Sequence, residues 1–284
     1  MVSEITKLPP RSFPHLLREM PDPPEQLYLR GTLPSEQTRL LAIVGSRKYS
    51  NYGKDVCEKL IAELRGHDIA IVSGLALGID SIAHEAALRN GLATVAIPGS
   101  GLSERVLYPR THVGLARRII DAGGALLSEF EPDTSAAPYT FPKRNRIMAG
   151  MSHGVLIIEA TERSGTLITA RLGMEYNREV MTVPGSVFSS SSYGPHTLIK
   201  NGATPITSGE DILEAFGIEK MSEKTKNIPL SEHERSIIEL LRSPQPKDDV
   251  IEALNLSISE AQTVLSALEI KGLIRERLGK LERS

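Results

Sequence analysis

The stretch from Phe141 to Ala170 carries the side chains best suited to hold an anion. Just before a short apolar run it gathers three cations and an amide: Lys143, Arg144, Asn145 and Arg146. Such groups bind phosphate oxygens through charge, and arginine adds forked hydrogen bonds. A chain that needed only a turn at this point would place neutral residues there. The cluster therefore indicates an anionic ligand.

A glycine turn follows the apolar run. Val155–Ile158 is short enough for a buried strand, and Ser164-Gly165-Thr166 then opens a helix. In a doubly wound parallel sheet, such a turn presents backbone N–H groups and the positive end of the helix to a phosphate. We expect Ser164 and Thr166 to donate hydroxyl groups and cap the helix, and Gly165 to let the backbone approach a ligand. The simpler alternative is that small residues only make a tight turn, because a single glycine turn is a weak motif.

Three other turns follow predicted strands and carry further candidate residues. The first two turns supply Gly45, Ser46, Arg47, Ser73 and Gly74, and the third supplies Arg110. Arg47, at the carboxyl end of its strand, can fork onto a phosphate, although a structural arginine would pair with a carboxylate instead. We favour the phosphate role for Arg47 because its turn faces the same edge of the sheet as the central turn.

The spacing of apolar residues predicts an α/β fold that places these turns at one edge of a sheet. Buried strands are expected at 39–44, 69–72, 93–97, 125–127, 155–158 and 179–183, with helices at 51–65, 80–90, 113–122, 167–177, 195–201 and 210–216. We divide the chain into a proline-rich N-terminal arm (1–38) with one short helix, a Rossmann-like domain (39–217), a polar linker (218–229) and a C-terminal domain (230–284). The C-terminal domain shows three helices and a hairpin, which is a winged-helix pattern.

These motifs together resemble the DNA-processing protein A family (DprA, also called Smf). Residues 141–170 follow its signature F-p-x-R-N-R-I-I-a-G-x-S and v-x-E-A-x-x-x-S-G-[TS]-L-x-T-A, and the chain also carries its G-S-R and S-G-x-A-x-G-I-D motifs at 45–47 and 73–80. It departs from the family pattern at Ser103, where aspartate is usual, and at His196, where asparagine is usual. The SAM-like domain that many members carry before the main domain is not evident.

The resemblance implies a fold, a function and partners. The fold is an extended Rossmann-like parallel sheet followed by a small winged-helix (DML1-like) domain. Members are described as dimers that bind single-stranded DNA and help to place the RecA recombinase on it, chiefly in natural transformation and homologous recombination. No catalytic activity, cofactor or metal is attached to them.

Composition limits the function classes. A net charge of −2 over 284 residues means that a DNA-binding surface must be a local patch. The single cysteine, Cys57, excludes a disulfide framework and a cysteine-based zinc site. Asp80 and His84, four residues apart, lack a third metal ligand at suitable spacing, so we expect a hydrogen-bonded structural pair. No signal peptide or long apolar span is evident, which predicts a soluble cytoplasmic protein without membrane contact.

Aromatic residues are few. They make up 4% of the chain and include no tryptophan. Base stacking can therefore dominate DNA binding only if a small set supplies it: Tyr49, Tyr52, Tyr108, Phe141 and Tyr193.

Two functional hypotheses follow. In the first, backbone N–H groups together with Arg47, Arg110, Lys143, Arg144 and Arg146 hold the consecutive phosphates of single-stranded DNA, and a homodimer gains avidity. In the second, the chain is a nucleoside-monophosphate phosphoribohydrolase similar to the LOG proteins, in which Arg146 binds the substrate and Glu159 assists cleavage. The first is favoured, since the paired glycines of those enzymes are absent and kinship of fold is a weak warrant for chemistry.

The winged-helix domain is a poor match for duplex DNA. Its third helix is expected to expose Ser259, Glu260, Gln262, Thr263 and Ser266, and it has no cation before Lys271. Residues 230–284 contain eight basic and ten acidic residues. Recognition of the major groove needs cations or amides that face phosphates and bases. We therefore expect this domain to serve protein contacts.

Overall fold

A computed structural model describes residues 4–218, 231–241, 245–254, 256–270, 274–277 and 280–283. The chain divides into two compact units, residues 1–220 and 221–284. The predicted linker at 218–229 falls almost wholly outside the described residues. Among the described residues, no helix is both long and apolar enough to cross a membrane.

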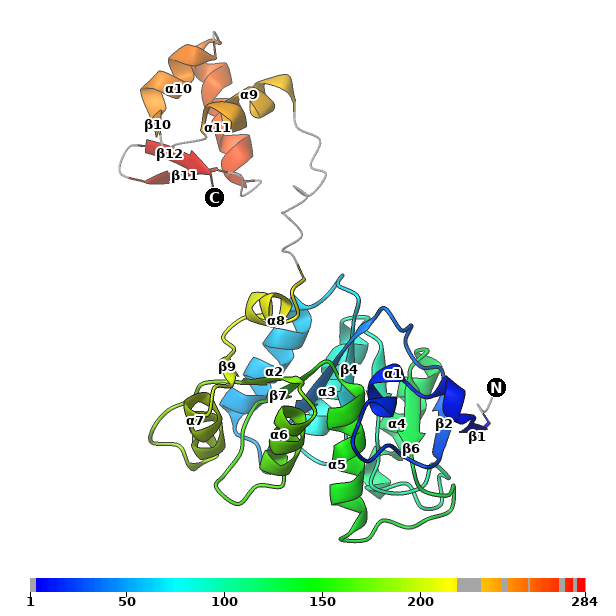
Figure 1. Cartoon of the computed structure of the whole chain (residues 1–284). Helices are drawn as coiled ribbons and strands as arrows, with labels where there is room; N and C mark the ends of the chain where they lie inside the picture. The colour runs from blue at the N-terminus through cyan, green and yellow to red at the C-terminus, as the bar shows by residue number, and fades with distance from the viewer. Residues whose placement is uncertain are drawn as a thin grey trace. The chain divides into compact units, whose positions relative to one another are not determined.

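The first unit is built on a nine-stranded sheet in the order β1-β2-β6-β5-β4-β3-β7-β8-β9 (Figure 1). Its strands are β1 (Thr6–Leu8), β2 (Leu27–Gly31), β3 (Arg39–Val44), β4 (Ile69–Ser73), β5 (Thr94–Ala96), β6 (Ala125–Ser128), β7 (Gly154–Ile157), β8 (Glu179–Thr182) and β9 (Thr204–Pro205). From β6 to β9 all neighbours pair in parallel, and β1 and β2 add an antiparallel edge. The predicted Rossmann-like parallel sheet is confirmed.

The central strands are apolar because both of their faces are covered. Along β3, Leu40, Ala42 and Val44 pack into one core, while Leu41 and Ile43 pack into the other. Side chains of a strand alternate between faces, so a strand buried on both sides reads as a continuous apolar run.

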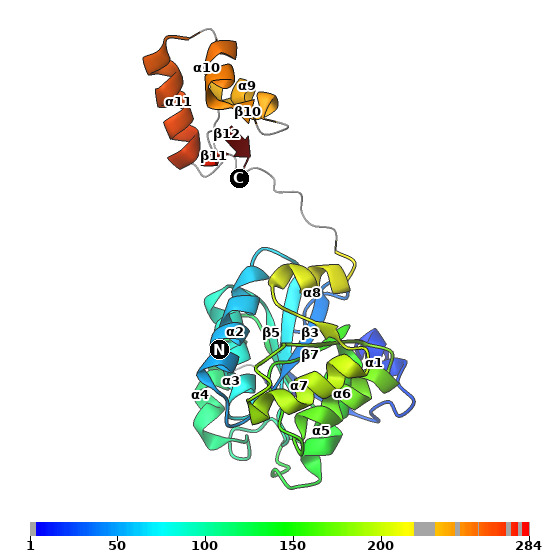
Figure 2. The ribbon, with the colours of Figure 1, turned by 90° about the vertical axis from the view of Figure 1, so that its left-hand side faces the viewer.

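Helices cover the two faces of this sheet. They are α1 (His15–Arg18), α2 (Asn51–Glu63), α3 (Ile79–Arg89), α4 (Val113–Asp121), α5 (Thr140–Met151), α6 (Thr166–Glu175), α7 (Tyr193–Lys200) and α8 (Gly209–Ala215), with short 3₁₀ turns η1 (Pro10–Ser12), η2 (Arg110–His112) and η3 (Ser190–Ser192). Figure 2 shows α2, α3 and α4 on one side of the sheet and α5, α6 and α7 on the other. The cores agree, since α5, α6 and α7 share one cluster and α2, α3 and α8 share another.

The N-terminal segment, expected to be an arm before the main domain, instead contributes the strands β1 and β2 to the sheet. β2 pairs with β6, from Tyr28 opposite Ser128 to Gly31 opposite Ala125, and β1 pairs with β2. Leu27 and Tyr28 are buried. The many prolines flank these strands rather than interrupt them, so the proline content was a misleading signal.

The basic cluster lies on a helix that is not among those predicted from the sequence. Helix α5 spans Thr140–Met151 and therefore includes Lys143, Arg144 and Arg146. Pro142 is compatible with this helix because the first turn has no intrahelical N–H bond to lose. The helical spacing sends neighbouring cations to different surroundings, which decides their roles below.

The second unit has the predicted winged-helix pattern. It comprises α9 (Glu232–Leu240), β10 (Gln245–Pro246), α10 (Lys247–Ala253), α11 (Ile258–Ile270), β11 (Ile274–Arg277) and β12 (Lys280–Arg283), and β10 pairs with β12 beside the hairpin. On α11, Ala261, Leu265 and Leu268 enter the core. The residues predicted to be exposed on this helix, Ser259, Glu260, Gln262, Thr263 and Ser266, are all exposed.

Candidate nucleic-acid interface

A pocket of about 580 Å³ opens where the order of the parallel strands reverses. β3 lies between β4 and β7, and the chain continues from β4 to one side and from β7 to the other. The loops on the two sides diverge there, which makes the carboxyl edge at such a point the usual ligand site of an open α/β sheet. We call it the switch-point pocket. It is lined by Val44, Gly45, Ser46, Arg47, Lys48, Ala76, Asp80, Phe141, Arg144, Asn145, Met148, Thr161, Ser164, Gly165, Thr166, Thr169, Ser190 and Ser191.

The switch-point pocket brings together eight of the thirteen predicted binding residues. These are Gly45, Ser46, Arg47, Arg144, Asn145, Ser164, Gly165 and Thr166. The other five, Ser73, Gly74, Arg110, Lys143 and Arg146, do not line it. The turns after β3 and β7 thus meet as expected, because parallel neighbours end at the same edge.

Arg47 is the cation best placed to receive a phosphate. Its side chain is exposed, and its guanidinium carbon lies 5.2 Å from the centre of the Phe141 ring. Within the part of the chain that the structure describes, this guanidinium makes no ion pair or hydrogen bond, so its donors face solvent. The ring supports the guanidinium plane without using its N–H groups. Lys48 adds a second exposed cation.

The glycine turn after β7 is joined to the end of β3. The Thr166 hydroxyl donates to the carbonyl oxygen of Gly45 over 3.2 Å, and the Ser164 hydroxyl accepts the Thr166 N–H. Gly165 occupies the N-cap position of α6 and has no side chain of its own, while the Ser164 hydroxyl accepts the first N–H of the helix, as expected. The next two N–H groups of the helix bond to carbonyl oxygens of the turn. The positive end of the dipole of the ten-residue helix α6 therefore lies at the pocket wall.

Gly165 is not required for the shape of its turn. Its φ of −60° suits any residue, and nothing lies within 4 Å of the position that a Cβ would occupy. The expected approach of a ligand to the backbone at Gly165 therefore does not depend on an unusual backbone conformation, and it stays a prediction. What its missing side chain provides is open space on the pocket wall.

Arg144 supports the pocket from below instead of offering a free donor. It is 5% exposed, it donates to the Ile97 carbonyl oxygen over 3.0 Å, and it lies 3.7 Å from the Asp80 carboxylate. Burial raises the pKa of Asp80, and the charge of Arg144 opposes that rise. Because both charges are buried, each depends on the other. Arg144 therefore has a structural role in this structure, and its phosphate contact stays a prediction.

Ser73 and Gly74 also serve the scaffold. A side chain at Gly74 would collide with the Arg144 guanidinium, so this glycine makes room for the arginine. The Ser73 hydroxyl is buried and donates to the Ile43 carbonyl oxygen over 2.6 Å. Neither residue is available to a strand of DNA in this conformation.

Arg146 points into a different pocket. Its guanidinium pairs with Glu129 and donates to the Asp22 carbonyl oxygen over 2.5 Å. Together with Lys143 it lines the α5–α6 pocket, a cavity of about 800 Å³ that also contains Asp22, Pro23, Glu25, Gln26, Glu129, Phe130, Glu131, Thr134, Pro142, Ile168, Leu172 and Tyr176. The expected phosphate contact of Arg146 is not supported, because its guanidinium is already paired with the carboxylates of Glu129 and Asp22.

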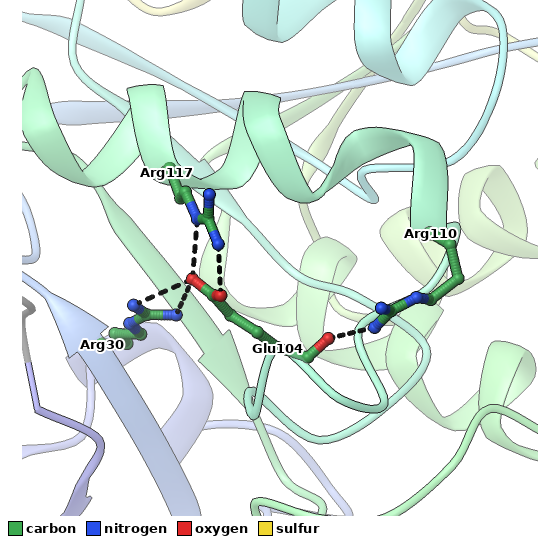
Figure 3. Close-up of polar contacts among 4 residues, drawn as sticks. All are labelled: Arg30, Glu104, Arg110 and Arg117. Carbon is green, nitrogen blue, oxygen red and sulfur yellow. Dashed lines mark hydrogen bonds and ion pairs between the residues drawn. The ribbon is translucent and has the colours of Figure 1, made fainter.

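Arg110 likewise has an internal partner, as Figure 3 shows. It donates to the carbonyl oxygen of Glu104, whose carboxylate is held by Arg117 at 2.7 Å and by Arg30 at 3.4 Å. The hydrogen bond from Arg117 is the main reason that the pKa of Glu104 falls to about 2. Arg110 is exposed but does not line the switch-point pocket.

The Glu159 carboxylate is hydrogen-bonded to the start of helix α2. Its carboxylate accepts from the Ser50 N–H at 2.9 Å, the Ser50 hydroxyl at 2.5 Å and the Ser191 hydroxyl at 2.9 Å. It is 3% exposed and does not line the switch-point pocket. The hydrolase hypothesis needed Glu159 and Arg146 at one site, and the structure separates them.

Five polar lining residues were not singled out from the sequence: Lys48, Thr161, Thr169, Ser190 and Ser191. The serine run at 189–192 was expected to be a mobile loop, but it contains the turn η3, and Ser191 is held by Glu159. The available signal was position, because this segment follows β8, the parallel neighbour of β7. Every loop at that edge was a candidate.

The other singled-out polar residues are structural. His84 contacts the Thr94 hydroxyl at 2.7 Å rather than Asp80, and burial lowers its pKa to about 3. His196 contacts the Gly185 carbonyl oxygen at 3.0 Å. Among the described residues, no cluster of three or more histidine, cysteine or acidic side chains is arranged to hold a metal ion.

Both units of the chain match models of known protein families. The family model described as DNA recombination-mediator protein A matches residues 5–217, and the DprA winged helix domain model matches residues 221–280. The chain is 39% identical to protein Smf of Escherichia coli over 92% of its own length and 72% of that protein. It is 43% identical to the DNA processing protein DprA of Streptococcus pneumoniae, over 72% of this chain and 71% of that one.

Two solved structures share the fold. The crystal structure of DprA from Streptococcus pneumoniae superposes with a TM-score of 0.69 at 40% identity, covering 74% of each chain. DNA processing protein A from Helicobacter pylori, described for its single-stranded DNA binding mode, superposes with a TM-score of 0.65 at 29% identity, covering 76% of this chain and 98% of that one.

Proposed function

Because this chain belongs to the DNA recombination-mediator protein A (DprA) family, we propose that its switch-point pocket binds single-stranded DNA. The relative from Helicobacter pylori has a described single-stranded DNA binding mode, which supports the same ligand here. The single observation that carries the proposal is the exposed Arg47 guanidinium, without an ion pair among the described residues, in the same pocket lining as the N-terminus of α6. Two phosphate-binding devices therefore face one cavity.

The wider role that we propose is protection of incoming single-stranded DNA in the cytoplasm and loading of the RecA recombinase on it. A pocket of about 580 Å³ accommodates only a few nucleotides, so one copy of the chain holds a short stretch. A homodimer would present two such pockets to one strand and gain avidity without new contacts. No specific observation favours the nucleotide hydrolase, and incubation with AMP should release no adenine.

A binding titration tests the proposal. Labelled single-stranded and double-stranded oligonucleotides of equal length are compared by fluorescence anisotropy across a salt series. We expect tighter binding of the single strand and an affinity that falls as salt rises, because phosphate contacts release counterions. Equal or tighter binding of the duplex would contradict the proposal.

A further inference from the structure

The exposed aromatic residues of this chain gather around the switch-point pocket. Of the twelve phenylalanine and tyrosine residues, six have strongly exposed side chains: Tyr49, Tyr52, Tyr108, Tyr139, Phe188 and Tyr193. We call these six the aromatic rim. Five of them lie within four positions of a residue that lines the pocket, and the sixth, Tyr108, packs its ring 5.9 Å from that of Phe141, which lines it.

Phe188 is the extreme member of the rim. Its side chain is 96% exposed, and that of its neighbour Val187 is 78% exposed. Among the described residues this apolar ring has almost no packing partner, although burial of such a side chain is strongly favourable. Ser190 and Ser191, two and three residues further along the chain, line the pocket, so the backbone of Phe188 is close to its rim.

The backbone that carries Phe188 is held on both sides. Before it, the Tyr52 hydroxyl donates to the Pro184 carbonyl oxygen over 2.6 Å. After it, Ser191 donates to Glu159, and the Phe188 N–H itself donates to the Ser186 hydroxyl over 3.2 Å. The exposed ring is therefore presented by a segment with defined contacts.

We propose that Phe188 stacks on an unpaired base of the strand whose phosphates the switch-point pocket holds. This inference rests on the proposed function and adds a contact between the protein and a base. The pocket lining supplies cations and hydroxyl groups, which suit phosphates, whereas the rim supplies flat apolar faces. Stacking tolerates any sequence because every base has a π face. A base in a duplex is already stacked, so the contact favours single strands.

Tryptophan fluorescence provides the test, because the chain contains no tryptophan. In Phe188→Trp the only indole is two residues from the lining residue Ser190, and we expect its emission to be quenched on titration with oligo-dT, with the same midpoint as the anisotropy titration. The matched control is Met174→Trp, an exposed position eight residues along α6 from Thr166. That position is about 12 Å further along the helix axis, and we expect its emission to change little.

A comparison of affinities separates stacking from charge. We expect Phe188→Ala to weaken binding of oligo-dT about tenfold with an unchanged salt slope, since stacking releases no counterions. An abasic strand keeps the phosphates and lacks the bases, so Phe188→Ala and the wild type should bind it equally.

Three results would overturn the inference. The first is saturable oligonucleotide binding with no change in the indole emission of Phe188→Trp. The second is an equal loss for Phe188→Ala on the normal and abasic strands. The third is a halved sedimenting mass for Phe188→Ala with unchanged DNA affinity, which would assign the ring to a contact between copies of the chain. Each of these results leaves the proposed function standing. The proposed function itself fails if the wild type does not prefer single strands.

Discussion

The switch-point pocket and the α5–α6 pocket both contain residues of the basic cluster, but their charges differ. In the switch-point pocket, Arg47 and Lys48 are exposed, and the only acid among the lining residues, Asp80, is buried against Arg144. The α5–α6 pocket holds Lys143 and Arg146 among four acids, Asp22, Glu25, Glu129 and Glu131. An arginine that already has carboxylate partners offers little to a phosphate. A run of cations in the sequence therefore does not by itself locate the phosphate site.

The largest effect is expected at the buried pair beneath the switch-point pocket. Arg144→Met should lower the free energy of unfolding by about 3 kcal/mol, because it leaves the Asp80 carboxylate buried without its partner. Urea unfolding followed by circular dichroism measures this. The double variant Arg144→Met with Asp80→Asn should regain part of the loss. If Arg144→Met alone were as stable as the wild type, Arg144 would not stabilise the fold beneath the pocket.

Reversing the charge of the switch-point pocket should make it resemble the other one. Gly165→Glu places a carboxylate in the open space beside the N-terminus of α6, and its backbone needs no glycine. We expect binding of single-stranded DNA to fall at least tenfold below that of Gly165→Gln, which has the same size and no charge. Both variants should keep the wild-type unfolding midpoint. Equal affinities of the two would place the phosphates elsewhere.

Lowering the pH should reduce the free energy of unfolding before it changes the charges of the switch-point pocket. The pKa of His84 is about 3 in the folded protein, below its ordinary value near 6.5, because burial disfavours the imidazolium. The unfolded chain therefore binds the proton first, and stability is lost as the pH falls from about 6.5 toward 3, by at most about 1.4 kcal/mol per pH unit. His153, whose pKa burial lowers to about 4, adds in the same direction.

Unfolding midpoints measured between pH 7 and pH 5 check the sign. His84→Gln, which removes the titrating group, should flatten the dependence. Stability that rises on acidification would contradict the assignment of a buried neutral imidazole.

The smallest effect is expected from removal of the second unit. A chain that ends at residue 220 keeps both pockets, and the exposed positions of α11 carry Glu260, Glu269 and neutral side chains. We expect its affinity for single-stranded DNA to lie within about twofold of the full chain, since few cations are lost from the binding surface. A folded truncated chain with most of its affinity gone would give the winged helix a direct part in binding.

The sequence predicted the strands and the turns of this site, because both are local signals. An apolar run such as Val155–Ile158 is recognisable within a few residues, and so is the glycine turn that follows it. The pairing of each arginine depends on distant partners. Arg144 meets the carbonyl oxygen of Ile97, and Arg146 meets that of Asp22. Without tertiary contacts, a phosphate-binding arginine and a structural one look alike.

The salt dependence of two matched variants tests the central claim most directly. Arg47→Gln removes the exposed cation of the switch-point pocket, and Arg146→Gln removes a paired cation of the α5–α6 pocket. The slope of log K against log salt is negative, and its magnitude should decrease by about 0.7 for Arg47→Gln, the value for one lost contact to single-stranded DNA. For Arg146→Gln the slope should stay unchanged. Circular dichroism confirms that both are folded. A slope reduced by Arg146→Gln and unchanged in Arg47→Gln would contradict the account.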